Sequence, residues 1–121
     1  MEKTKRIVIA DDDPAILDAI GTILEYKGYQ VLQALNGEGL TEMENEFPDL
    51  LLLDIWMSGI DGRDICKKLK TSESTCKIPI VLISAGKDIE KSAREAGADD
   101  FLAKPFEIEE LFKMIELHTA N

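Results

Sequence analysis

The sequence is poor in the residues that form disulfide bonds or bind transition metals. Its 121 residues include one histidine and two cysteines, with no CxxC motif and no cluster of these residue types. This excludes the common zinc sites and a disulfide framework, so we expect Cys66 and Cys76 to be reduced thiols. The single histidine, His118, has no evident partner, and we expect no phosphorelay role for it.

Long apolar segments are also absent. The sequence has no secretory signal, and its longest apolar runs are far too short to cross a membrane. It contains no repeat, no low-complexity tract and no linker rich in Gly, Pro and Ser. We therefore expect a single domain over residues 1–121, in the cytoplasm and without a membrane partner.

Positive charge is in deficit. There are 14 Lys and Arg residues against 24 Asp and Glu residues, which gives a formal net charge of -10. A chain this acidic is repelled by phosphate backbones, so we expect no direct binding to nucleic acid by this domain. A metal cation or a basic partner surface suits it better.

Five short apolar runs alternate with segments of helical periodicity. The runs are near-continuous, which is typical of parallel strands covered on both faces. Five such βα units predict an α/β fold with an open, doubly wound parallel sheet and right-handed crossovers. The predicted strands are Arg6–Ala10, Gln30–Ala34, Leu50–Leu53, Ile78–Ile83 and Asp100–Ala103.

The segments that follow the strands carry apolar residues at helical spacing. The helix expected over Asp88–Ala96 has only Ile89, Ala93 and Ala96 as its inward stripe, so it should be the least firmly anchored. The other four stripes are Ile16, Ile20, Ile23 and Leu24; Leu40, Met43 and Phe47; Ile65 and Leu69; and Ile108, Leu111, Phe112 and Ile115.

Polar side chains follow four of the five predicted strands. In doubly wound sheets, ligands bind outside the carboxyl ends of the strands. Two adjacent carboxylates about 4 Å apart repel by roughly 4 kcal/mol at an effective dielectric near 20, so converging acids need a counterion. Mg²⁺ or Mn²⁺ on a few carboxylates is the simplest one. The residues at this edge are Asp11, Asp12, Asp13, Asp54, Ser84 and Lys104.

Each of these residues also has an ordinary explanation when taken alone. Asp13 precedes Pro14, so we interpret it as a helix N-cap. Asp54 alone could cap a turn, and Lys104 alone could be a surface lysine. Together, however, a carboxylate nucleophile, a divalent cation, a lysine and a hydroxyl are sufficient for phosphoryl transfer. The lysine and the hydroxyl would stabilise the phosphoryl oxygens.

Six short segments occur in an order and spacing that resemble the receiver domain of two-component response regulators, the chemotaxis-regulator-like family. The resemblance covers essentially the whole chain. It implies a flavodoxin-like sheet with strand order 2-1-3-4-5 and five helices. The segments are ADDD at 10–13, FPDLLLLD at 47–54, MSGIDG at 57–62, IVLISA at 80–85, GADDFL at 97–102 and KPF at 104–106.

The resemblance implies a catalytic role for each matching residue. Asp54 would be the phosphoacceptor, and Asp11 and Asp12 would be the acidic pair that holds Mg²⁺. The backbone carbonyl of Trp56 would be a further metal ligand. Lys104 would pair with the phosphoryl group. The phosphodonor would be a sensor histidine kinase or a phosphotransfer protein, and the domain would not be a turnover enzyme.

The resemblance also implies a switch. Ser84 would be the switch hydroxyl and Phe101 the aromatic switch, and the family often has a cis peptide before the residue matched by Pro105. Phosphorylation would then change the surface formed by the fourth helix, the fifth strand and the fifth helix, where an output domain or protein binds.

Ser58 and Trp56 are expected to affect the loop and the site next to Asp54. Ser58 stands where the family usually has proline, so we expect a less rigid loop. Bulky Trp56 should partly shield the site.

Three rival functions share part of this pattern. A haloacid-dehalogenase-type phosphohydrolase needs a second Asp where this chain has Trp56. An FMN carrier needs a phosphate loop where this chain has three aspartates. A degenerate receiver that binds partners without phosphorylation is the alternative.

Overall fold

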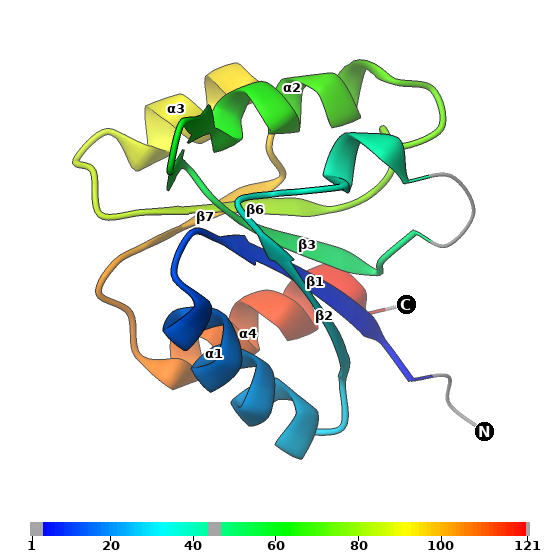
Figure 1. Ribbon diagram of the computed structural model, residues 1–121, viewed down its shortest axis with the longest axis vertical. Helices are drawn as coiled ribbons and strands as arrows, with labels where there is room; N and C mark the ends of the chain where they lie inside the picture. Colours follow the sequence, from blue (N-terminus) through cyan, green and yellow to red (C-terminus); the bar gives the residue numbers. More distant parts are fainter. Residues whose placement is uncertain (1–3, 44–46, 121) are drawn as a thin grey trace.

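Five parallel strands form the central sheet of the protein (Figure 1). The structure is a computed structural model, and it describes residues 4–43 and 47–120. The strand order is β2-β1-β3-β6-β7, which in chain order confirms the predicted 2-1-3-4-5. The strands are β1 (Arg6–Asp11), β2 (Gln30–Leu35), β3 (Leu50–Asp54), β6 (Ile80–Ser84) and β7 (Asp100–Ala103).

Helices cover both faces of this sheet (Figure 1). On one face lie α2 (Gly62–Thr71), α3 (Ile89–Ala96) and the one-turn 3-10 helix η1 (Leu40–Glu42), and on the other lie α1 (Pro14–Tyr26) and α4 (Ile108–Thr119). The four leucines of β3 alternate between the two apolar cores, and all four are fully buried. Burial of apolar surface on both faces is therefore the main force that holds the sheet together.

Four of the predicted strands are longer at their carboxyl ends than expected. Asp11, Leu35, Asp54 and Ser84 are the last residues of their strands, and each still has a partner in the ladder. The first residues of β6 differ as well. This strand begins at Ile80, two residues later than predicted, because Pro79 has no N–H to donate to a neighbouring strand.

The helix predicted from Leu40, Met43 and Phe47 is wrong over its described part. Only the turn Leu40–Glu42 forms, and Met43 already has an extended backbone. Residues 44–46 lie outside the described residues. Gly39 precedes the turn with a φ of 82°, and no side chain caps it, so a longer helix has no favourable start. The described part of the chain thus has four α-helices instead of five.

The inward stripe of α1 is also shifted from the prediction. Its buried residues are Leu17, Gly21 and Leu24, whereas Ile23 is 38% exposed. A Cβ on Gly21 would lie 3.2 Å from the side-chain amide of Gln33, so a glycine lets this helix approach β2 closely. The prediction counted only large apolar residues, and it could not weigh a glycine that packs by its small size.

The stripe of α3 is confirmed, since Ile89, Ala93 and Ala96 are its buried residues. Both cysteines are free thiols, as expected. No helix within residues 4–43 and 47–120 is long and apolar enough to cross a membrane.

An ion pair and a histidine–carboxylate hydrogen bond fix the start of β7. Lys70 of α2 lies 2.6 Å from Asp99, whose carboxylate also accepts from the backbone N–H of Ile80. On the other face of the sheet, Nε2 of His118 in α4 lies 2.8 Å from Asp100. The expectation that His118 has no partner is therefore wrong, because a partner 18 residues away cannot be recognised from the sequence alone.

Candidate functional site

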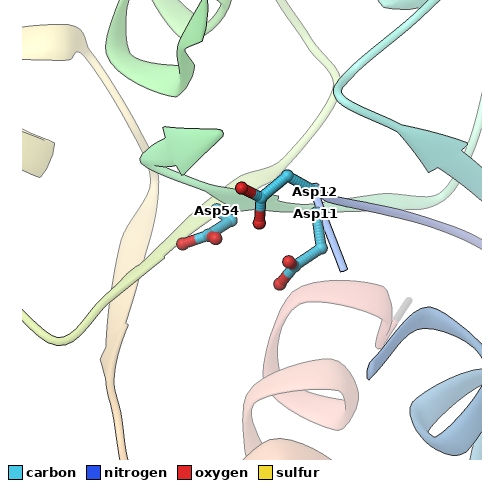
Figure 2. A group of neighbouring side chains, drawn as sticks. All are labelled: Asp11, Asp12 and Asp54. Carbon is cyan, nitrogen blue, oxygen red and sulfur yellow. The ribbon is translucent and has the colours of Figure 1, made fainter. Parts of the chain in front are cut away.

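Three carboxylates meet at the carboxyl edge of the sheet (Figure 2). Asp11 ends β1, Asp12 follows it, and Asp54 ends β3, which is the neighbouring parallel strand. One oxygen from each carboxylate lies within 4.8 Å of the others. Asp11 and Asp54 are only 4% and 6% exposed, so their charges are largely removed from water. This convergence was predicted from the strand ends.

One lysine faces this acidic cluster. Nζ of Lys104, the residue after β7, lies 3.4 Å from Oδ2 of Asp11 and 3.6 Å from Oδ2 of Asp54. The peptide bond from Lys104 to Pro105 is cis, as the resemblance implied. Lys104 thus contacts carboxylates from two different strands, and its ammonium group is the positive charge that the sequence predicted at this edge of the sheet.

The electrostatics of the cluster favour a further cation. Burial raises the pKa of Asp54; Lys104 opposes that rise, while Asp11 and Asp12 add to it. A single ammonium group cannot neutralise three carboxylates at this distance. Hard oxygen ligands of this kind, with part of the group open to solvent at Asp12, fit a magnesium or manganese ion.

Asp13 does not belong to the cluster. Its Oδ1 accepts from the backbone N–H of Ala15 at 2.9 Å, and Pro14 is the first residue of α1. The N-cap interpretation is therefore confirmed. The backbone N–H of Asp13 in turn donates to Oδ1 of Asp11 at 3.0 Å, so the cap also helps to orient a carboxylate of the cluster.

Ser84 and Phe101 lie on the two strands beyond β3. Ser84 ends β6 and is 2% exposed, and its hydroxyl accepts from the backbone N–H of Gly86 at 3.0 Å. Phe101 lies in β7, is partly buried and packs against the core that contains Ile89 and Ala93 of α3. The switch roles of Ser84 and Phe101 stay a prediction.

A short hairpin closes the loop between β3 and α2. It consists of β4 (Trp56–Met57) and β5 (Ile60–Asp61), which pair antiparallel. Gly59 has a φ of 72° in its turn, a conformation that glycine adopts without strain. The hydroxyl of Ser58 donates to Oδ2 of Asp12 at 3.1 Å. The residue that replaces the family's proline thus attaches the loop to the cluster, which sequence reasoning missed.

Gly62 makes a second close approach that sequence reasoning missed. A Cβ at this position would overlap the carbonyl oxygen of Asp54, and the N–H of Gly62 donates to the carbonyl of Ile55 at 2.7 Å. The Asp61-Gly62 pair at the start of a helix was the available signal. The role of the Trp56 carbonyl as a metal ligand stays a prediction.

Comparison with known proteins agrees with this geometry. Residues 7–116 match the family model of the response regulator receiver domain. The chain belongs to this family. The receiver domain is 39% identical over 113 residues to a DNA-binding dual master transcriptional regulator, RpaA, from Synechocystis. That match covers 91% of this chain and 47% of the relative, so the receiver domain spans about half the length of the curated relatives it matches.

Solved structures show the same fold. The signal receiver domain of a signal transduction histidine kinase from Syntrophus aciditrophicus superimposes with a TM-score of 0.87 at 30% identity, over 97% of this chain and 91% of that one. The response regulator TrrA from Thermotoga maritima, in complex with Mg²⁺-BeF, has a TM-score of 0.81 at 29% identity, over 95% of this chain and 99% of that one.

Proposed function

We propose that this receiver domain takes a phosphoryl group from a sensor histidine kinase, or from a phosphotransfer protein, onto Asp54. The observation that carries the proposal is the convergence of Asp11, Asp12 and Asp54 with Lys104 on one sheet edge. The Mg²⁺ complex of the related TrrA supports a magnesium requirement. Asp11, Asp12, Asp54 and the carbonyl of Trp56 would hold the ion, which would neutralise charge on the phosphoryl oxygens.

Phosphoryl transfer to Asp54 requires few groups other than these residues and the metal ion. The Asp54 carboxylate attacks phosphorus, a P–O bond forms, and the bond from phosphorus to the kinase imidazole breaks, with its electron pair returning to the ring nitrogen. Lys104 and the hydroxyl of Ser84 then bind the phosphoryl oxygens. Because the phosphoryl group stays on Asp54 as the signal until it is hydrolysed, the domain acts as a phosphoacceptor and not as a turnover enzyme on a small substrate.

The new charge at Asp54 would shift a two-state element. Ser84 would turn toward the phosphoryl group, and Phe101 would move inward toward the core beside α3. The surface formed by α3, β7 and α4, which is the predicted output surface, would then change its affinity for an output domain or protein. RpaA is named as DNA-binding, whereas the acidic charge of this domain argues against nucleic-acid contacts of its own. A kinase donor is consistent with a cytoplasmic location.

Treatment with acetyl phosphate and Mg²⁺ tests the phosphoacceptor. We expect the intact mass to rise by one phosphoryl group, hydroxylamine added after removal of acetyl phosphate to reverse the increase, and a chelator added beforehand to prevent it. Asp54→Asn should show no adduct, while Asp13→Asn, which keeps the helix cap, should be modified like the wild type. A hydroxylamine-sensitive adduct on Asp54→Asn would overturn the assignment. A wild type that takes no phosphoryl group would favour the degenerate receiver.

A further inference from the structure

Trp56 lies at the rim of a cavity between the end of β6, where Ser84 lies, and the start of α3. Trp56 is 59% exposed although it directly follows two buried residues, Asp54 and Ile55. The cavity has a volume of about 230 Å³, and Ser84 and Trp56 both line it. An aromatic ring with this exposure has few contacts of its own to fix its rotamer, so its orientation depends on what packs against its face.

Arg63 packs against that face. The guanidinium carbon lies 4.8 Å from the centre of the Trp56 ring, which is the geometry of a cation–π contact. Arg63 lines the same cavity and belongs to the first turn of α2. A cation near a helix N-terminus is unfavourable for the helix dipole, so helix stability gives no reason for an arginine here.

Asp61 in turn fixes Arg63. Nη2 of Arg63 lies 2.6 Å from Oδ2 of Asp61, and Nε lies 3.0 Å from Oδ1, so the pair is bidentate. The hydrogen bonds from Arg63 hold the pKa of Asp61 below its usual value. Asp61 also caps α2 and pairs with Trp56 across the hairpin. Each of the three residues therefore contacts the other two. Trp56 and Asp61 pair through their backbones, Asp61 and Arg63 form an ion pair, and Arg63 makes a cation–π contact with Trp56.

We propose that Arg63 is a positioning residue that holds the Trp56 ring at the cavity lined by Ser84, and so slows the hydrolysis of the aspartyl phosphate. The inference rests on the proposed function. In that hydrolysis a water oxygen attacks phosphorus, the P–O bond to Asp54 breaks, and inorganic phosphate and the free carboxylate result. A ring held at the rim of the cavity reduces the space from which water reaches the phosphorus atom.

The expected effect is modest, because Arg63 and Asp61 are both partly exposed to solvent. Losing a cation–π contact of this kind should shift the population of the held rotamer by about two- to fivefold. Arg63→Gln should therefore shorten the lifetime of the phosphorylated form by about two- to fivefold. Arg63→Lys keeps the charge but loses the planar, bidentate group, so it should lie between the wild type and Arg63→Gln.

Two further variants separate this role from helix stability and from net charge. Asp61→Asn keeps a good N-cap but loses the ion pair that fixes Arg63, so it should resemble Arg63→Gln. Lys67→Gln removes an exposed cation from the same helix and leaves the Trp56 contact intact. This control should behave like the wild type.

The experiment has two readouts on the same proteins. Trp56 is the only tryptophan, so acrylamide quenching of its fluorescence reports on the ring without any phosphorylation. We expect stronger quenching in Arg63→Gln and Asp61→Asn than in the wild type and Lys67→Gln. The second readout is the first-order loss of the phosphoryl group after removal of acetyl phosphate, at fixed Mg²⁺ concentration.

The outcomes distinguish this inference from the proposed function. If the wild type accepts a phosphoryl group but Arg63→Gln changes neither quenching nor lifetime, the inference fails and the proposed function stands. Stronger quenching with an unchanged lifetime also overturns it, since the ring would then not limit access of water. If the wild type accepts no phosphoryl group at all, both fail.

Discussion

At the scale of single residues, neighbouring aspartates have different roles. Asp11 and Asp12 lie in the acidic cluster with Asp54 (Figure 2). Asp13 instead accepts from the backbone N–H of Ala15 at the start of α1. Sequence spacing alone separates these roles, because proline follows Asp13 directly and favours the first helical position.

Asp13→Ala should lower the free energy of unfolding by about 1 kcal/mol, because the N–H of Ala15 loses its acceptor. Asp13→Asn keeps an acceptor and should cost much less. Urea denaturation measures both values. Phosphorylation by acetyl phosphate should be largely intact in each variant, and a complete loss of phosphorylation in Asp13→Asn would show that Asp13 belongs to the chemical site.

The side-chain contacts that the sequence did not predict join residues that only the tertiary structure brings together. Ser58 reaches Asp12 over 46 positions, and His118 reaches Asp100 over 18. Neither pair has a spacing rule, unlike a helix cap or an i,i+4 pair. Arg63 and Trp56 meet only because the hairpin brings them together. Local patterns therefore predicted the cluster, but not the contacts that orient its surroundings.

At the scale of elements, the strands were predictable and one helix was not. A continuous apolar run bounded by a polar residue gives both the strand and its carboxyl end, which is why Asp54 and Ser84 were placed correctly. The segment after β2 has helical spacing at Leu40 and Met43, yet Gly39 with a positive φ and the absence of a cap leave only one turn. The spacing of apolar residues predicts which face a helix would bury, but it does not predict whether the segment has the capping residues with which a helix begins.

The junction between β3 and α2 should tolerate no side chain at Gly62. In Gly62→Ala the new Cβ would overlap the carbonyl oxygen of Asp54, so backbone must move directly at the phosphoacceptor. We expect a loss of about 1–3 kcal/mol in the free energy of unfolding and slower phosphorylation. Both are measured on the purified variant, by urea denaturation and by intact mass.

Gly21→Ala is the matched control for that substitution. Its Cβ would meet the end of the flexible Gln33 side chain instead of backbone, and alanine favours a helix more than glycine does. We expect little change in the free energy of unfolding and normal phosphorylation. An equal loss in the two variants would contradict the special role of the Asp54 carbonyl.

At the scale of the whole molecule, we expect the acidic cluster to couple the free energy of unfolding to metal binding. Three carboxylates packed together with one lysine oppose folding, and a divalent ion that binds only the folded chain opposes unfolding. The same geometry that prepares the site for chemistry therefore leaves the metal-free protein less stable than its core would allow.

Mg²⁺ at about a hundred times its dissociation constant should raise the free energy of unfolding by about 2.7 kcal/mol. Thermal denaturation with and without the ion measures this rise. Asp12→Ala removes one ligand and should abolish the rise, while Lys67→Gln should keep it. A rise of the same size in Asp12→Ala would place the ion elsewhere.

The Lys70–Asp99 ion pair and the His118–Asp100 hydrogen bond at the start of β7 fix one end of this strand. Asp99 is held from the α2 side of the sheet and Asp100 from the α4 side, so one end of this edge strand is clamped between both layers. The other end carries Lys104, which contacts the carboxylates. Phe101 directly follows the fixed residues, so it lies between the end of β7 that is held by both helical layers and the end that contacts the acidic cluster.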